Sequence, residues 1–331
     1  MKAVVYTRYG PPDVLRLADV ETPAPRDDEV LVRVRAVSLN ASDWEMLRGK
    51  PLYSRMSGPF RPRHQVLGSD VAGQVEAVGR RATRFRPGED VFADVLSHMG
   101  GFAEYVCVPE RALAPMPSGM TYQEAAALPQ AGAIALQGIR EKGRVRAGHQ
   151  VLVNGAGGGS GMYAIQLAKL HGAEVTGVDN PEKQEFMRSL GADHVIDYRR
   201  EDYTRNGKTY DLVLDVQAFR GVHAYARSLA PGGRYFYVGG SVGTLFQVML
   251  FGPWIGRGAG KRIRMLVVRL GSRHLGPLVE LCQAGKVSTI VDRRYSLDEV
   301  PQALAYLGNG HAKGKVLIIV DPATPQRHVI D

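Results

Sequence analysis

Residues 150–179 read QVLVNGAGGGSGMYAIQLAKLHGAEVTGVD, and this stretch decides the fold. It opens with an apolar run, passes through glycines, continues as an amphipathic segment closed by Gly172, and ends in a second apolar run at Asp179. Continuous apolar runs are typical of strands buried on both faces, and strands that alternate with helices favour a parallel sheet. The stretch therefore predicts a strand–helix–strand unit with a glycine-rich turn before the helix.

The turn carries the A-x-G-x-x-G pattern of a dinucleotide-binding loop, with alanine in the place of the first glycine. Its residues are Ala156, Gly157, Gly158, Gly159, Ser160 and Gly161. A side chain at Gly158 would keep a diphosphate away from the backbone, and Gly161 lets the helix approach the strand closely. The start of the helix offers N–H groups and a positive dipole end to phosphate. We therefore predict that this loop binds a nicotinamide dinucleotide, NAD(P)H.

Asp179 bears on the choice between the two cofactors. It follows Gly161 by 18 residues and Gly158 by 21, close to the spacing of about 20 expected of an acid that binds the adenosine ribose. A carboxylate there accepts hydrogen bonds from the ribose hydroxyls and repels a 2′-phosphate, which favours NAD(H). Lys183 and Arg188 follow closely and would weaken that repulsion. The alternative is an aspartate that only caps a turn.

The residue pattern of the chain changes before and after this unit. The first 115 residues read as short strands and turns, as in EVLVRVRAVSLN, where apolar and basic residues alternate. Thr121 and Glu124 form a capping box before a helical segment, after which strands and helices alternate. We predict an α/β fold in which a Rossmann domain, a doubly wound parallel sheet, spans residues 122–275. A β-rich domain spans residues 1–121 and 276–331.

Bulk composition excludes several classes of protein. Only two cysteines occur, Cys107 and Cys282, which excludes a disulfide scaffold and fits a reducing compartment. The sequence shows no signal-peptide pattern and no apolar run of about 18 residues, so we expect a cytoplasmic protein. The net charge is +9, and no acidic residue occurs from Val216 to Val279. That segment holds nine basic residues: Arg220, Arg227, Arg234, Arg257, Lys261, Arg262, Arg264, Arg269 and Arg273.

The segment 241–273 allows two interpretations. SVGTLFQVMLFGPWIG is strongly apolar, and KRIRMLVVRL places basic residues around an apolar centre. We favour a wall of a substrate pocket followed by an edge strand, Arg262–Leu270, that pairs with a second subunit in a homodimer. The other interpretation is an anchor on a membrane surface.

Several motifs outside the loop resemble one superfamily. They are Gly68-Ser69-Asp70-Val71-Ala72-Gly73 followed by Gly79, Arg86-Pro87-Gly88-Glu89-Asp90-Val91, EAAALPQAGAIALQGI, LGADHVIDY, PGGRYFYVGG and HAKGKVLI. Together with the domain order they resemble the medium-chain dehydrogenases/reductases, in the zinc-free quinone oxidoreductase branch that includes zeta-crystallin. The resemblance covers nearly the whole chain and implies that the β-rich domain is GroES-like.

The resemblance also implies that no zinc takes part. Zinc-dependent members ligate the catalytic metal through a cysteine, a Gly-His-Glu motif and a second cysteine. The matching positions here are Asn40, then Ser69 with Asp70, then a site near Ala131, none of which offers the thiolate or imidazole ligands that zinc prefers. His64 and His98 lack the spacing of a zinc site. We expect hydride to pass from the nicotinamide to a quinone or an α,β-unsaturated carbonyl compound.

Substrate-side and cofactor-side residues follow from the same resemblance. In the loop NASDWEMLRGKPLY, the resemblance implies that Asn40 donates to the acceptor oxygen, that Asp43 orders the loop, and that Trp44 and Tyr53 stack on a flat substrate or, for Tyr53, supply a proton. For each of them the alternative is a role in packing. Arg61, Arg63 and His64 lie at the mouth. Beyond the glycine loop and Asp179, the implied cofactor contacts are Lys183, Tyr198, Val216, Val238, Gly239, Gly240, Ser241 and Lys315. Ser160 and Ile134 depart from the usual valine and threonine.

Other functions remain open at this point. An enoyl-thioester reductase would use the basic segment to hold a carrier phosphate, and an alcohol dehydrogenase-like enzyme of the same superfamily is a further alternative. A non-enzymatic alternative is a nucleotide-responsive protein that binds RNA or a membrane surface. The chain lacks a dedicated nucleic-acid motif, so no nucleic-acid partner is expected.

Overall fold

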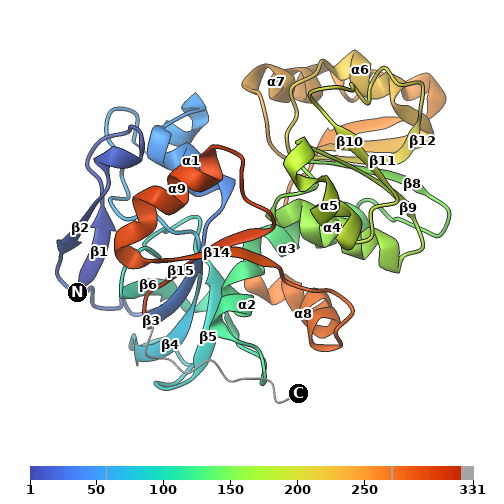
Figure 1. Cartoon of the computed structure of the whole chain (residues 1–331). Helices are drawn as coiled ribbons and strands as arrows, with labels where there is room; N and C mark the ends of the chain where they lie inside the picture. Colours follow the sequence, from blue (N-terminus) through green and yellow to red (C-terminus); the bar gives the residue numbers. More distant parts are fainter. Residues whose placement is uncertain (57, 270, 322–331) are drawn as a thin grey trace. The chain divides into compact units, whose positions relative to one another are not determined.

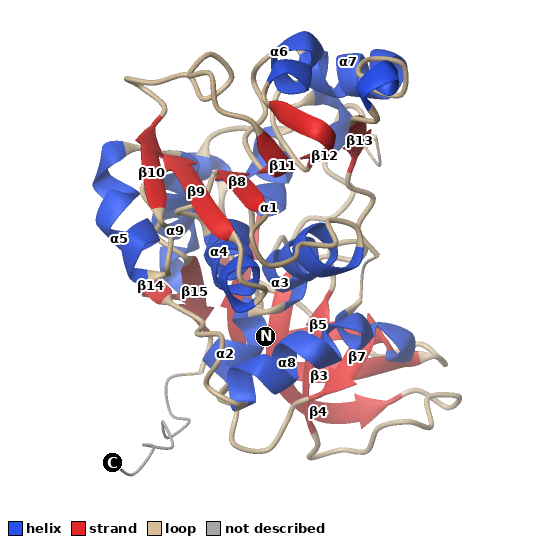
Figure 2. Cartoon of the chain, turned by 90° about the vertical axis from the view of Figure 1, so that its right-hand side faces the viewer, coloured by secondary structure: helices blue, strands red, loops and turns tan. Residues whose placement is uncertain are grey.

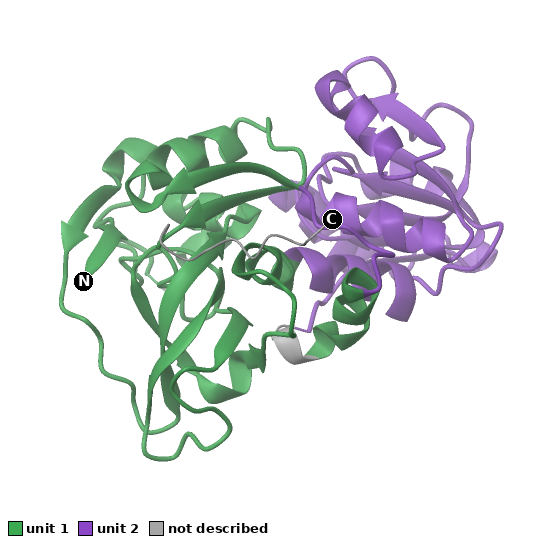
Figure 3. Ribbon diagram, turned by 60° about the horizontal axis from the view of Figure 1, so that its bottom comes forward, with its two compact units in different colours: residues 1–130, 270–283, 291–331 green, residues 131–269, 284–290 purple. Residues whose placement is uncertain are grey.

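The structure is a computed structural model that describes residues 1–56, 58–269 and 271–321. It divides into two compact units, shown in Figure 3: unit 1 is 1–130, 270–283 and 291–331, and unit 2 is 131–269 and 284–290. The domain boundaries at 121/122 and 275/276 stay predictions, and residues 322–331 lie outside the described part. The predicted fold class, a doubly wound parallel sheet with a GroES-like β-rich domain, is confirmed.

Unit 1 is built on a seven-stranded sheet in the order β14-β15-β3-β4-β5-β7, with β6 paired to β3. Its strands are β3 (Glu29–Ser38), β4 (Asp70–Val78), β5 (Asp90–Asp94), β6 (Tyr105–Pro109), β7 (Leu113–Pro115), β14 (Val291–Ser296) and β15 (Lys315–Ile319). A separate pair joins β1 (Lys2–Val5) and β2 (Arg16–Asp19). In β3 the alternating valines are buried while Arg33 faces solvent, as the alternation of the sequence predicted.

The α-helices that lie wholly in the described part of unit 1 are α1 (Ala41–Arg48), α2 (Tyr122–Ala127), α8 (Gly276–Gln283) and α9 (Val300–Gly308). The predicted capping box is confirmed, because the Glu124 N–H donates to Thr121 Oγ1 at 3.2 Å and the Thr121 N–H donates to Glu124 Oε2 at 2.8 Å. The long helical segment after it is interrupted. A new helix, α3 (Pro129–Ala135), starts at Pro129, because proline lacks the N–H that would continue the hydrogen-bond ladder.

Unit 2 is a six-stranded sheet in the order β10-β9-β8-β11-β12-β13, and every pairing is parallel. The strands are β8 (Gln150–Asn154), β9 (Glu174–Asp179), β10 (His194–Asp197), β11 (Tyr210–Asp215), β12 (Leu229–Tyr237) and β13 (Arg262–Met265). The helices are α4 (Gly159–Leu170), α5 (Gln184–Ser189), α6 (Val222–Arg227) and α7 (Val242–Phe251). Figure 1 shows α4 and α5 on one face of the sheet and α6 and α7 on the other.

The order of this sheet reverses at β8, which lies between β9 and β11. In open parallel sheets, ligands bind beyond the carboxyl ends of the strands at such a reversal. The glycine loop follows the end of β8 and therefore lies at that point. Within the described residues no helix is long and apolar enough to span a bilayer.

The edge strand of the sheet is shorter than predicted. β13 ends at Met265, which pairs with Tyr237, the last residue of β12, so the ladder ends where its partner strand ends. The predicted strand ran on to Leu270, which lies outside the described residues. The apolar run before it, which the sequence left without a secondary structure, forms α7.

Candidate functional site

The glycine loop joins β8 to α4 through a tight, well-anchored turn. The N–H groups of Gly155 and Ala156 both donate to the Val178 carbonyl on β9, at 2.9 and 3.1 Å. Gly155 has a φ of +81°, a conformation that side chains disfavour. The loop is therefore held across the carboxyl ends of two neighbouring strands before the helix starts.

Two glycines of this loop have different surroundings. A Cβ at Gly161 would lie 2.4 Å from the Ala156 carbonyl oxygen, so the close approach predicted for Gly161 is confirmed. A Cβ at Gly158, the N-cap of α4, would meet only the Gly155 carbonyl oxygen, at 3.5 Å. Packing of the chain thus requires glycine at position 161 but leaves open space in front of position 158.

Asp179 lies buried behind the loop at the end of β9. Its Oδ2 accepts the Gly157 N–H at 2.9 Å, and its Oδ1 accepts the Asn180 N–H at 2.8 Å and lies 3.4 Å from Lys183 Nζ. Lys183 is buried as well. Asp179 therefore makes the local hydrogen bonds of the turn-capping alternative, while its role toward a ribose stays a prediction. Arg188 is exposed and its guanidinium lies 3.5 Å from Gln184 Oε1.

The other cofactor residues predicted in unit 2 lie at the same edge of the sheet. Tyr198 follows β10, is half exposed, and donates its N–H to the Asp179 carbonyl at 3.2 Å. Val216 follows β11, and residues 238–241 follow β12, held by bonds such as Ser241 N–H to the Ala218 carbonyl at 2.8 Å. Unit 2 thus gathers these residues at one edge, whereas Lys315 belongs to unit 1.

Asp215, at the end of β11, is a buried side chain that sequence reasoning missed. Its Oδ1 accepts Asn154 Nδ2 at 2.7 Å and the Gln217 N–H at 3.2 Å. Its Oδ2 accepts the hydroxyls of Tyr235 at 2.8 Å and Tyr203 at 3.2 Å. Burial raises the pKa of Asp215 to about 6 against these four donors. Through Asn154 and Gln217 the carboxylate ties together the loops that follow β8 and β11.

In unit 1, Asp43 orders the start of α1, as predicted. Its Oδ2 accepts the Asn40 N–H at 2.8 Å and the Ser69 hydroxyl at 2.9 Å, and its Oδ1 accepts the Gly68 N–H at 3.1 Å. The side chain is fully buried. Burial raises the pKa of Asp43 to about 6, opposed by these hydrogen bonds and by the charge of Lys315.

The Asn40 amide is fully engaged within unit 1. Its Nδ2 donates to Ser69 Oγ at 3.1 Å and to Asp70 Oδ2 at 2.9 Å, and its Oδ1 accepts Lys315 Nζ at 2.7 Å. An amide nitrogen carries two N–H donors, and both have partners here. Donation from Asn40 to an acceptor molecule, which stays a prediction, would require one of these bonds to open.

Lys315 and Asp70 are buried in the same cluster. Lys315 Nζ also donates to the Leu39 carbonyl at 3.3 Å, and Asp70 Oδ2 accepts the Gln130 N–H at 3.1 Å. Burial and the nearby Asp94 hold the pKa of Asp70 well above its usual range. Burial lowers the pKa of Lys315, against the attraction of Asp70 and Asp43. The cluster joins residues that the sequence separates by up to 276 positions.

The remaining substrate-side residues make local contacts. A Cβ at Gly308 of α9 would lie 2.4 Å from the Trp44 ring, so Trp44 packs against that glycine. The hydroxyl of Tyr53 donates to Glu45 Oε2 at 3.1 Å. Arg61 and Arg63 are exposed, and burial followed by the charge of Arg63 lowers the pKa of the half-buried His64. Stacking on a substrate by Trp44 or Tyr53 stays a prediction.

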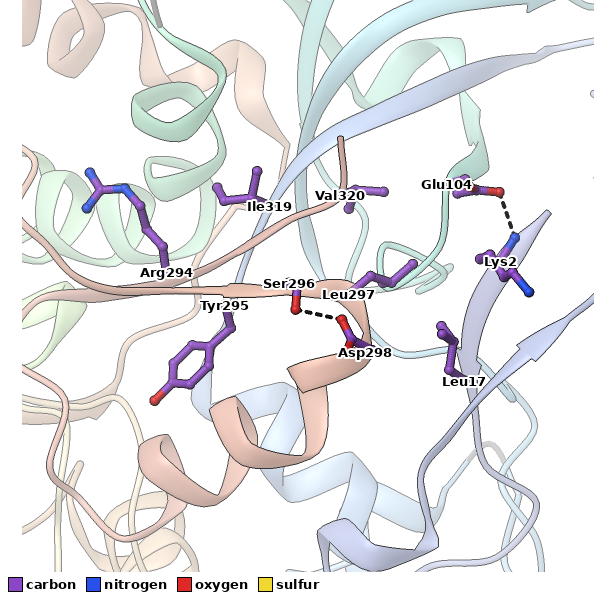
Figure 4. A pocket seen from close by; sticks show the side chains of 10 residues that line it. All are labelled: Lys2, Leu17, Glu104, Arg294, Tyr295, Ser296, Leu297, Asp298, Ile319 and Val320. Atoms are coloured by element: carbon purple, nitrogen blue, oxygen red, sulfur yellow. Dashed lines mark hydrogen bonds between the residues drawn. The ribbon is translucent and has the colours of Figure 1, made fainter. Parts of the chain in front are cut away.

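A hollow of about 520 Å³ lies elsewhere on unit 1, as Figure 4 shows. Its lining consists of Lys2, Leu17, Glu104, Arg294, Tyr295, Ser296, Leu297, Asp298, Ile319 and Val320. Two of its polar pairs are already joined, Lys2 N–H to Glu104 Oε2 and Ser296 Oγ to Asp298 Oδ1, both at 2.6 Å. The hollow contains none of the predicted site residues.

Two family models match the chain. An alcohol dehydrogenase GroES-like domain matches residues 26–118, and a zinc-binding dehydrogenase model matches residues 190–318. The two matches follow each other in the order that the fold shows, with the β-rich part first.

Curated and solved relatives cover nearly the whole chain. A chloroplastic quinone-oxidoreductase of Triphysaria versicolor is 32% identical over 96% of this chain and 98% of its own length. A chloroplastic NADPH-dependent alkenal/one oxidoreductase of Arabidopsis thaliana is 33% identical over 97% of this chain and 80% of its own. The structure of the quinone oxidoreductase of Coxiella burnetii superposes with a TM-score of 0.86 at 28% identity and covers 97% of this chain and 99% of that one.

Proposed function

The chain belongs to the quinone oxidoreductases of the medium-chain dehydrogenase/reductase superfamily, and we propose that it reduces a quinone or an α,β-unsaturated carbonyl compound with NAD(P)H. The names of the relatives support this substrate class. The observation that carries the proposal is the open space before Gly158, at the start of α4 and at the reversal point of the sheet.

A bound nicotinamide would supply the hydride. The residues of this chain have the tasks of binding and orientation: the N–H groups at the start of α4 would hold the diphosphate, and residues of the loops after β11 and β12 would line the same site. Asp215 fixes the first of those loops through Gln217 and fixes the end of β8 through Asn154. On the substrate side, the Asp43 and Lys315 hydrogen bonds hold Asn40 in one orientation.

We propose that no zinc assists the reaction. At the positions that match the zinc ligands of relatives, Asn40 Oδ1 faces the ammonium of Lys315 at 2.7 Å, and Ser69 donates to Asp43. A cation at this place would oppose the charge of Lys315 and would find no thiolate or imidazole. The donor set therefore does not fit zinc.

We further propose a modest preference for NADH over NADPH, because a carboxylate at Asp179 disfavours a 2′-phosphate. Lys183, 3.4 Å away, reduces that effect. Asp179→Ser should shift the ratio of dissociation constants toward NADPH by about tenfold or more, since a charge-assisted hydrogen bond contributes about 1.5–3 kcal/mol. Asp193→Ser, at the opposite end of the sheet, is the control. Calorimetric titration with both cofactors measures the ratio, and an unchanged ratio would remove Asp179 from this role.

The proposed cofactor site is tested by two alanine substitutions that differ only in position. Gly158→Ala should leave stability within about 0.5 kcal/mol but weaken NADH binding at least tenfold, because the added methyl fills the space before the helix. Gly161→Ala should instead lower stability by about 1–3 kcal/mol, since its Cβ meets the Ala156 backbone. Thermal unfolding and calorimetry separate the two, and normal NADH binding by Gly158→Ala would contradict the site.

A spectrophotometric screen tests the reaction itself. NADH and NADPH oxidation is followed with quinones, enals, acyl thioesters and simple aldehydes, with and without a chelator. We expect turnover with the first two classes, unaffected by the chelator. Activity confined to thioesters or aldehydes, or lost with the chelator, would favour the enoyl-thioester reductase or a metal-dependent alcohol dehydrogenase instead.

We also propose a cytoplasmic homodimer. Among the strands that the structure describes, β13 pairs with β12 alone, and its other edge could pair with a second copy. The two cysteines of the sequence fit a reducing compartment. Light scattering on the purified protein gives the oligomeric state.

A further inference from the structure

The amino-terminal edge of the unit 2 sheet carries a small hollow that is rich in arginine. Its volume is about 280 Å³, and its lining includes the turn 231–233 with Arg144, Arg146, His149, Asp211 and Arg234. These residues precede β8 or lie where β11 and β12 begin to pair, and the three strands are neighbours in the sheet (Figure 2). The glycine loop lies at the opposite, carboxyl edge, so the hollow is separate from the proposed cofactor site. We call it the arginine hollow.

The charge of the arginine hollow is unbalanced. Its described lining holds three guanidinium groups and one carboxylate, that of Asp211. In the part of the chain that the structure describes, no acidic oxygen lies within 4.0 Å of the three guanidinium groups. Asp211 Oδ2 accepts the Gln150 N–H at 2.8 Å. The lining therefore has two positive charges in excess.

The arginines of this edge repel one another. Arg262 of β13 is the register partner of Arg234 on β12, and directly paired residues of neighbouring strands project from the same face of a sheet. Burial lowers the pKa of Arg234, and the charges of Arg262 and of the two arginines at 144 and 146 lower it further. An anion placed between these guanidinium groups would replace repulsion with attraction.

The loop that carries Arg144 and Arg146 is held in place. Val145, between them, is buried, and Arg234 Nη1 donates to the Gly143 carbonyl at 2.5 Å, which ties β12 to this loop. Arg144 has a φ of +51°, a left-handed conformation that is unfavourable for residues other than glycine. Strained backbone of this kind is found at ligand sites. The loop arginines are therefore kept beside Arg234 before any ligand binds.

We propose that the arginine hollow binds a phosphate group with two negative charges, as in inorganic phosphate or a small phosphomonoester. Guanidinium groups carry paired N–H donors whose geometry matches phosphate oxygens. Arg144 and Arg146 are exposed, so a ligand can reach their donors. The two charges of the ligand balance the two positive charges in excess. The proposal is independent of the proposed reaction, since it invokes neither nicotinamide nor acceptor.

Larger ligands fit the hollow less well. Its volume of about 280 Å³ lies just below the range of about 300–1,000 Å³ that is typical of pockets for drug-sized molecules. Its described lining has no phenylalanine, tyrosine or tryptophan on which a nucleobase could stack. Each phosphate of a nucleic-acid backbone carries a single charge, which would leave one positive charge unbalanced. These features favour a small dianion over a nucleotide or RNA.

Calorimetric titration of the full chain tests the proposal. It is run at pH 8, where inorganic phosphate and phosphomonoesters are mostly dianions, at constant ionic strength and with an excess of NADH to occupy the glycine loop. We expect one inorganic phosphate to bind per chain. Dimethyl phosphate, which has one charge, should bind at least tenfold more weakly. Glycerol phosphate distinguishes the two sources, because the tighter of the two dianions shows whether free phosphate or a phosphomonoester is preferred.

Two variants and a matched control localise the binding. Arg144→Gln with Arg146→Gln should weaken phosphate binding at least tenfold, because two charged donor groups are lost. Arg146→Lys keeps the charge but loses the paired donors, so its affinity should fall between those of the wild type and the double variant. Arg80→Gln with Arg86→Gln changes the net charge equally at two exposed arginines of unit 1 and should have no effect. A cooperative thermal transition without phosphate shows that each variant is folded.

Several results would overturn the proposal. It fails if neither dianion binds, or if dimethyl phosphate binds as tightly as inorganic phosphate. If the double glutamine variant binds phosphate like the wild type, the anion occupies another place. If the unit 1 control loses as much affinity as that variant, the binding reflects net charge alone. It also fails if RNA, and neither dianion, binds in a manner that the double variant abolishes, because the hollow is then a nucleic-acid contact.

Discussion

Both units bury aspartate side chains completely, but they stabilise them by different means. In unit 1, Asp43 and Asp70 share their surroundings with a buried ammonium, that of Lys315. In unit 2, the donors to Asp215 among the described residues are neutral: one amide, one backbone N–H and two tyrosine hydroxyls. The difference shows that hydrogen-bond donors can satisfy every lone pair of a carboxylate without supplying a counter-charge.

The two arrangements should respond to pH in opposite directions when each is broken. Removing the ammonium of unit 1 leaves ionised carboxylates without their cation, which is worst at high pH. Removing the charge of Asp215 relieves an ionisation that burial disfavours, which helps most at high pH. Stability measured against pH therefore distinguishes a compensated carboxylate from one held by neutral donors.

Lys315→Met should have the largest effect. Removing one partner of a buried charge cluster costs about 3–5 kcal/mol, because Asp70 and Asp43 lose the buried ammonium whose charge opposes the effect of their burial. The deficit should shrink from pH 8 to pH 5, since the pKa of Asp43 is about 6 and protonated carboxyls need no counter-charge. Denaturant unfolding measures it, with Lys313→Met, an exposed lysine in the loop just before β15, as the control. A deficit below about 1 kcal/mol at pH 8 would contradict this account.

Asp215→Asn should have a smaller effect, with the opposite dependence on pH. The pKa of Asp215 is raised from 3.8 to about 6 by burial, so the folded protein binds more protons than the unfolded chain between those values. This contribution to stability is present below about pH 4 and is lost as pH rises through 6. The asparagine variant has no such loss.

Relative to the wild type, Asp215→Asn should therefore gain on the order of 1–3 kcal/mol between pH 4 and pH 8. Its carbonyl can still accept from Asn154, and its amide can donate to the tyrosine oxygens. Urea unfolding of both proteins across this range gives the difference. A difference that does not change with pH would mean that the carboxyl titrates alike in the folded and unfolded states.

The glycine loop also differs from the buried cluster around Lys315 in unit 1 in how far the sequence predicts it. The loop is a local feature: strand, glycines, helix and the acid at Asp179 all fall within 30 residues, and each element was predicted. The cluster joins Asn40, Asp70, Gln130 and Lys315, which no short pattern connects. The sequence named Asn40 and Asp43 from a resemblance and assigned Lys315 to the cofactor, but their mutual contacts depend on the pairing of β3 with β4 and β15.

Two further differences between the predicted and the observed elements have local causes, which the sequence indicates only in part. Pro129 breaks the helical segment after Thr121, and proline inside a helical pattern is a known stop signal. The sequence does not predict the orientation of α7, because a short apolar run is normally buried on all sides. The burial of Thr244 and Val248 shows which side of the helix faces inward. Asp215 ends an apolar strand, a position typical of a functional site. The two tyrosines that donate to it are Tyr203, which precedes its strand, and Tyr235 of β12.

Tyr235→Phe and Tyr203→Phe should have the smallest effects and sharpen the comparison. Each removes one neutral donor to Asp215 Oδ2 and keeps the ring, including the stacking of Tyr235 on Tyr225 at 4.1 Å. We expect a loss of about 1–2 kcal/mol at pH 8 for Tyr235, whose hydroxyl lies 2.8 Å from the carboxylate. The loss should be smaller for Tyr203, at 3.2 Å.

Both losses should diminish at pH 5, because a protonated carboxyl depends less on each donor than an ionised one does. Combining either substitution with Asp215→Asn should make the tyrosine change cost less than it does in the wild type at pH 8, since the charge that strengthened the hydrogen bond is then gone. Unfolding of the two double variants measures this coupling. If the losses remained fully additive, the hydroxyls would be stabilising the packing of the sheet and not the charge of Asp215, and the contrast with Lys315 would no longer hold.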